Sequence, residues 1–100
     1  MTIPQISVFL ENKAGQLADI TGILSENQVN MRAINIAETT DYGVLRLIVD
    51  DASRASSILL EQGFILTMTP VVGVAVPDTP GGLSRVLGVI SDAGIDVEYM

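Results

Sequence analysis

Two short segments of the chain carry residue types that could hold a small zwitterion. One reads NKAGQL from Asn12, and the other reads DTPGGL from Asp78. Their glycines, Gly15 and Gly81, permit a positive φ or a close approach of the backbone to a ligand. A helix that begins after each glycine would offer unpaired N–H groups to a carboxylate. Asn12 or Asp78 could accept a hydrogen bond from an ammonium group. The same residue types also cap helices and form turns, and that structural alternative stays open.

The two segments belong to an internal repeat with an offset of 66 positions (81 − 15). Gly15 matches Gly81, and the register holds without a gap through the apolar positions that follow. A repeat of this length indicates one supersecondary unit used twice. Gly22 also recurs, as Gly88, although a glycine inside a helix costs roughly 1 kcal/mol relative to alanine. Its recurrence favours the close approach of another helix or a ligand over a tolerated surface glycine.

The composition is apolar for so short a chain. Its 100 residues suit one ordinary domain, or two very small ones that share a core. They are 48% hydrophobic and 17% charged, which indicates a face buried against a partner domain or a second subunit. We therefore expect a homodimer or a domain-paired assembly. A net charge of −7 with five basic residues argues against a nucleic-acid partner.

The residues that commonly carry catalysis or bind metals are missing. The sequence has no histidine and no cysteine, so it lacks the usual proton shuttle and the imidazole and thiolate ligands. We expect no cofactor and no metal. The N-terminus lacks the basic and apolar regions of an export signal, and the apolar runs are too short to span a bilayer. These features predict a cytoplasmic protein without membrane contact.

Hydrophobic periodicity predicts alternating strands and helices through the first part of the chain. In order, these are strand Gln5–Leu10, helix Gln16–Gln28, strand Val29–Thr39, strand Val44–Val49, a helix that is capped by Asp50 or Asp51 and runs to about Gln62, and strand Phe64–Thr69. This order predicts an α+β fold, the ferredoxin-like βαββαβ sandwich, in which two helices cover one face of a four-stranded antiparallel sheet.

The second predicted strand changes its apolar phase. Met31 and Ile34 have opposite parity, and a regular strand with one buried face cannot carry both. We therefore predict a β-bulge near Arg32 and Ala33, followed by a hairpin turn at Thr40–Gly43.

Pro70 marks a predicted boundary between residues 1–70 and residues 71–100. The second part reads as strand Val71–Val76, helix Gly82–Ala93 and strand Ile95–Met100, which is the first half (βαβ) of a second such unit. Half a unit leaves an apolar helix face and sheet edges uncovered. We expect a second unit truncated at Met100; completion of the fold by another chain is the alternative.

A ferredoxin-like unit whose first loop reads Asn-x-Ala-Gly or Asp-x-Pro-Gly, followed by leucine and an aliphatic helix, resembles the ACT domain. Asn30 and Asp96 lie where that family begins the strand after the helix. The arrangement is similar to small stand-alone tandem ACT proteins, with one departure: Ala14 replaces the common proline. The resemblance implies a regulatory module that binds amino acids between domains. The implied ligand-binding residues are Asn12, Ala14, Gly15, Gln16, Leu17, Asn30, Asp78, Pro80, Gly81, Gly82, Leu83 and Asp96.

Three other functions remain as alternatives. An assembly module would use the same apolar surfaces without a small ligand. An enzyme would need convergent acid–base groups, but we expect Asp19, Glu26, Asp41 and Glu61 to be scattered over solvent-facing positions. RNA binding would need basic residues and strand aromatics, and the sequence has only four aromatic residues. We therefore expect a non-enzymatic regulatory module that binds an amino acid, with an enzyme as its possible regulated partner.

Overall fold

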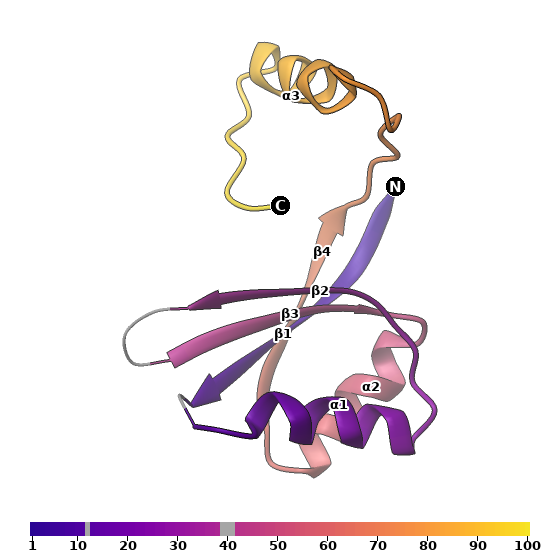
Figure 1. Ribbon diagram of the computed structural model, residues 1–100, viewed down its shortest axis with the longest axis vertical. Helices are drawn as coiled ribbons and strands as arrows, with labels where there is room; N and C mark the ends of the chain where they lie inside the picture. Colours follow the sequence, from indigo (N-terminus) through magenta and orange to yellow (C-terminus); the bar gives the residue numbers. More distant parts are fainter. Residues whose placement is uncertain (12, 39–41) are drawn as a thin grey trace.

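The computed structural model describes residues 1–11, 13–38 and 42–100 of the chain. Its elements, in chain order, are β1 (Thr2–Glu11), α1 (Gln16–Glu26), β2 (Met31–Glu38), β3 (Tyr42–Val49), α2 (Ala52–Glu61), β4 (Ile65–Val72) and α3 (Gly82–Asp92). The four strands form one antiparallel sheet in the order β2-β3-β1-β4, and helices α1 and α2 lie on the same face of it (Figure 1). This arrangement confirms the ferredoxin-like prediction.

The two helices of the sheet begin in different ways. The side chain of Asp51 caps α2 by accepting a hydrogen bond from the backbone N–H of Arg54 at 3.1 Å, as the sequence predicted. Helix α1 follows Gly15, which has φ +87° and contributes no side chain to the cap. The start of α1 therefore keeps backbone donors that no capping side chain of Gly15 can satisfy.

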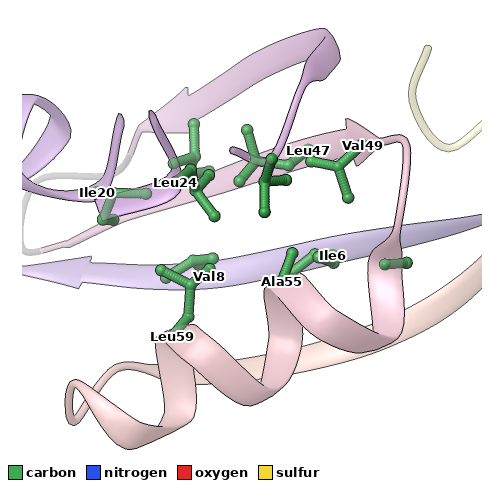
Figure 2. Packing of buried hydrophobic residues seen from close by; sticks show 11 residues of the cluster. Ile6, Val8, Ile20, Leu24, Leu47, Val49, Ala55 and Leu59 are labelled. Carbon is green, nitrogen blue, oxygen red and sulfur yellow. The ribbon is translucent and has the colours of Figure 1, made fainter. Parts of the chain in front are cut away.

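The hydrophobic core lies between the sheet and the two helices (Figure 2). In the sheet, Ile6 lies opposite Leu47 and Val8 lies opposite Leu45 on the neighbouring strands β1 and β3. These side chains are completely buried beneath the helices. The helices contribute the following buried residues: Ile20 and Leu24 from α1, and Ala52, Ala55 and Leu59 from α2.

The predicted bulge is confirmed. The pairing of β2 with β3 shifts register between Met31 and Ala33, after which Ile34 lies opposite Leu47. The shift returns Ile34 to the helix-facing side, yet Ile34 and Ile36 stay 51% and 48% exposed because β2 is an edge strand. The predicted turn at Thr40–Gly43 has its first two residues outside the described part of the chain.

The second part of the chain differs from the sequence prediction in its strands. Strand β4 continues through Pro70 to Val72, so Val71 and Val72 pair with β1 instead of opening a separate strand. Residues 95–100 follow α3 without joining a ladder. A strand needs a neighbour for its backbone groups, and residues 71–100 contain no hairpin strand to supply one. Helix α3 stands apart from the first unit (Figure 1). The division at Pro70 stays a prediction.

Within the described residues, no helix has both the length and the apolar character needed to cross a membrane.

A leucine pair on α2 tests the core. Leu59 is fully buried, whereas the adjacent Leu60 is 55% exposed. Leu59→Ala should lower the free energy of unfolding by about 2–5 kcal/mol, since it removes buried methyl groups and leaves a cavity. Leu60→Ala should change it by about 0.5 kcal/mol. Urea denaturation followed by circular dichroism measures both, and equal losses would contradict the assigned helix orientation.

Candidate functional site

The two repeated loops have the same backbone geometry. Gly15 has φ +87° and ψ −9°, and Gly81 has φ +87° and ψ −6°. Each glycine carbonyl accepts the first bond of its helix, from Asp19 N–H at 2.9 Å and from Arg85 N–H at 3.1 Å. A left-handed φ is strained for residues with a Cβ, which explains a glycine at both positions. The sequence repeat is therefore a repeat of structure.

A hollow of about 580 Å³ lies beside the first loop. Its lining comes from the end of β1, the start of α1, the start of β3 and the connection from α2 to β4: Phe9, Leu10, Glu11, Gln16, Tyr42, Gln62, Gly63, Phe64 and Ile65. It thus joins the N-terminal end of α1 to three aromatic residues, Phe9, Tyr42 and Phe64, and to the carboxylate of Glu11. This composition suits a small amphiphilic molecule with an apolar portion.

Gln16 places a buried polar atom at this hollow. Its Oε1 atom is buried and has no hydrogen-bond partner among the described residues. A buried acceptor without a hydrogen-bond donor destabilises the folded protein, so such an atom commonly marks a place where a bound molecule supplies the donor. The backbone N–H groups of Gln16, Leu17 and Ala18 also lack acceptors within α1, because they belong to its first turn. Acceptor and donors thus lie together at one helix end.

Glu11, the last residue of β1, forms an ion pair with Lys13 in the first loop. Lys13 Nζ lies 2.7 Å from Glu11 Oε2, and both side chains are 68% exposed. The hydrogen bond and the charge of Lys13 lower the pKa of Glu11, and the same pairing raises the pKa of Lys13. The contribution of Glu11 to the free energy of unfolding is therefore lost as the pH falls through the pKa of Glu11 in the folded protein. The contribution of Lys13 is lost as the pH rises through the pKa of Lys13 in the folded protein. Glu11 is therefore held as a carboxylate beside the hollow.

The second loop is tighter than the first. Gly82 is buried and donates its N–H to the carbonyl of Thr79 at 3.1 Å. A Cβ at this position would stand 2.4 Å from the carbonyl oxygen of Pro77. Gly82 is thus required by close backbone contact, whereas Gly15 and Gly81 are required by their positive φ and have open space around them.

A second hollow, of about 640 Å³, lies between the end of β4, α3 and residues 95–100. It brings together Leu83 and Asp96, two of the residues named from the sequence. Most of its lining is aliphatic, including Val76 and Ile90. The first hollow therefore borders the start of α1, whereas the second lies along α3, and their linings differ in chemistry.

The remaining named residues lie elsewhere. Ala14, Leu17, Asp78 and Pro80 are exposed in or beside the loops and line neither hollow. Asn30 lies beyond the other end of α1, where its N–H donates to Asp50 Oδ1 at 3.2 Å and its carbonyl accepts from Asp50 N–H at 3.1 Å. Asn12 is outside the described residues.

The helix glycines have no close neighbour within the chain. A Cβ at Gly22 or Gly88 would meet nothing within 4 Å. Gly22 borders a groove of about 470 Å³, with Asp19 and Glu26 along the same helix. The close approach expected at these glycines stays a prediction.

Sequence reasoning missed most of the first hollow's wall. Phe9, Tyr42, Gln62 and Phe64 come from separate elements, and no local motif joins them. Only the topology places the ends of β1 and α2 and the starts of β3 and β4 together. A signal was nevertheless present in the sequence, since Phe9 is a large aromatic residue on the side of its strand that also carries Ser7.

Known proteins with a similar sequence or structure identify the family of this chain. The family model described as an ACT domain pair matches residues 1–100. The crystal structure of protein BT0572 from Bacteroides thetaiotaomicron is similar, with a TM-score of 0.94 and 42% identity, covering 99% of this chain and 69% of that chain. No curated protein matches.

Two more distant structures share the fold alone. The regulatory subunit of aspartate kinase from Thermus thermophilus, in its ligand-free form, has a TM-score of 0.71 and 19% identity, covering 96% of this chain and 73% of that chain. An unknown protein from Galdieria sulphuraria has a TM-score of 0.60 and 19% identity, covering 94% and 66% respectively. With the full-length family match and the repeated loops, the chain belongs to the ACT domain pair family, whose members are regulatory domains that generally bind small ligands such as amino acids.

Proposed function

We propose that this chain is a non-enzymatic regulatory module that binds an apolar amino acid in the hollow beside Gly15. The observation that carries the proposal is the unpartnered Oε1 of Gln16 next to the uncapped start of α1. A free amino acid offers both complements at once, a carboxylate for the helix N–H groups and an ammonium for the buried acceptor.

The first hollow supplies a partner for each part of such a ligand. The carboxylate lies at the N–H groups of the first turn of α1, where the helix dipole also favours negative charge. The ammonium lies toward Gln16 Oε1 and the ionised Glu11. Phe9, Tyr42 and Phe64 line the hollow, so an apolar amino acid fits better than a charged one. Asn12 was predicted from the sequence as a further ammonium acceptor.

The loop at Gly81 is a second candidate site. Its helix start repeats the geometry of α1, and Leu83 borders a hollow that also contains Asp96. Its aliphatic lining supports an apolar ligand as well. We propose residues 1–70 and 71–100 as the two units of the pair, with each unit contributing one such loop.

An assembly function without a small ligand is the second candidate. It is favoured by the apolar surface around β4 and the following segment, where Ile65, Val72 and Val74 are exposed. This surface is compatible with either contact between units or contact between chains. The two functions are separable, because only ligand binding depends on the glycine loops.

Substitution of the loop glycines tests ligand binding. Gly15→Val or Gly81→Val should abolish binding at its own loop, since a β-branched residue resists φ +87° and fills the open space beside the glycine. Calorimetric titration with each of the twenty amino acids measures this. The control Glu61→Ala, at the end of α2, should bind like the parent. Parent-like binding by both glycine variants would leave assembly as the function.

Gln16→Met separates a binding role from a structural one. Methionine has nearly the same length but removes the unpaired buried acceptor, so the free energy of unfolding should stay the same or rise. Affinity for the amino acid should fall by roughly tenfold, which corresponds to one hydrogen bond to a charged group. Thermal unfolding and calorimetry measure the two quantities. A less stable variant with unchanged affinity would show that Gln16 serves only folding.

We also propose that the chain associates through the apolar surface formed by the end of β4 and the segment that follows it. Sedimentation velocity at micromolar concentration should show a species heavier than the monomer. Val72→Lys combined with Val74→Lys should shift it to the monomer, because charge in a buried contact is unfavourable. Leu60→Lys, which charges an equally exposed leucine on α2, should leave association unchanged. A monomeric parent protein would contradict the proposal.

A further inference from the structure

Two side-chain contacts join Tyr99 to the sheet of the first unit. Its hydroxyl accepts a hydrogen bond from Gln5 Nε2 at 2.9 Å. The guanidinium carbon of Arg46 lies 3.8 Å from the centre of its ring, which is the geometry of a cation–π contact. The segment after α3 curves back from the helix toward the sheet (Figure 1), so residues 94 places apart in sequence meet there.

These contacts lie on the sheet face opposite α1 and α2. Ile6 and Leu47 form a helix-facing pair, and side chains alternate along strands. Gln5 and Arg46 therefore point to the face that the first unit leaves uncovered. Arg46 also donates to Asn35 Oδ1 at 3.4 Å. The group Asn35, Arg46, Tyr99 and Gln5 thus connects β2, β3 and β1 with the segment after α3.

The contact is specific but narrow. Gln5 is only 7% exposed, so its amide needs a partner when water is excluded. Tyr99 supplies that partner. Every residue from 95 to 100 is nevertheless exposed, including Ile95 and Met100. In the described part of the chain, the hydrogen bond and the cation–π contact that join this segment to the sheet both come from one aromatic side chain.

In the structure the ring of Tyr99 lies against Arg46 and its hydroxyl meets Gln5, an arrangement that we call closed. Release of Tyr99 to an open arrangement would give up one cation–π contact and one hydrogen bond and would expose all three groups to water. Contacts of this size can be broken locally without unfolding the sheet beneath them.

We propose that Tyr99 is a latch that docks the second unit on the open sheet face of the first and releases it as a local two-state switch. Tyr99 lines the same hollow as Leu83 and Asp96. An apolar molecule that fills this hollow therefore shifts the latch equilibrium, because it contacts the segment differently when the latch is closed and when it is open. The latch itself does not depend on the proposed amino-acid site at Gly15.

The chain is well suited to a direct test, because Tyr42 and Tyr99 are its two tyrosines and it has no tryptophan. In a Tyr42→Phe background, the intrinsic fluorescence comes from Tyr99. Its quenching by acrylamide should be weaker than that of free tyrosine, and its anisotropy should be high. Arg46→Met and Gln5→Met should each shift the closed-to-open ratio by roughly fivefold toward the open state, as expected for loss of a single contact of this kind.

Two controls make the result decisive. Arg54→Met removes an arginine from α2, outside the latch, and should leave quenching of Tyr99 unchanged. Circular dichroism must show that the sheet is retained in every variant, and Arg46→Met serves as the second test if Gln5→Met unfolds. The proposal would be overturned if Tyr99 in the Tyr42→Phe protein were quenched as strongly as free tyrosine. It would also be overturned if Arg46→Met left the quenching of Tyr99 unchanged in a folded protein.

Discussion

The covering of one sheet face and not the other is the constraint on which the rest of this structure depends. Two helices cross over the same side of four strands, because each βαβ connection returns on that side. Ile6, Val8, Leu45 and Leu47 are buried there as a result. The opposite face has no helix of its own in the first unit. Its most polar position, Arg46, is met by Tyr99 from the far end of the chain. The fold thus buries a core on one face of the sheet and leaves on the other face the residues that Tyr99 contacts.

Glycine conformation determines where the polar chemistry lies. The left-handed φ at Gly15 turns the chain from β1 into α1 without a capping side chain, whereas Asp51 caps α2 with its carboxylate. A capped helix start has less to offer an anion. The first turn of α1 therefore differs from that of α2 in having no side-chain cap, and it lies beside the buried acceptor of Gln16.

The fold could be predicted from the sequence because its signals are local. The helical spacing of Ile20 and Leu24 predicted α1, and the parity change after Met31 predicted the bulge in β2. The strand expected at residues 95–100 was not found in a ladder, since pairing depends on a neighbour and not on the apolar pattern of the segment itself. The continuation of β4 through Pro70 is likewise a property of pairing, because Pro70 lies opposite Pro4 at the sheet edge.

The candidate site was predicted only in part for the same reason. The repeat identified both glycine loops, and the structure brings Gln16 to one hollow and Leu83 with Asp96 to the other. Glu11 and Phe64 could not be assigned from spacing, because the ends of different elements supply them. Contacts over the greatest sequence separation, such as Gln5 with Tyr99, carry no pattern in the sequence.

The two glycine loops share a backbone geometry but differ in the residues that surround them. Gly15 and Gly81 have nearly identical φ and ψ, but the N–H of Gly82 in the second loop already donates to the carbonyl of Thr79. The surroundings differ: Glu11 and three aromatic residues border the first hollow, whereas aliphatic residues dominate the second. Under the proposed function, any difference in selectivity between the two loops therefore comes from the occupied Gly82 N–H and from these different surroundings.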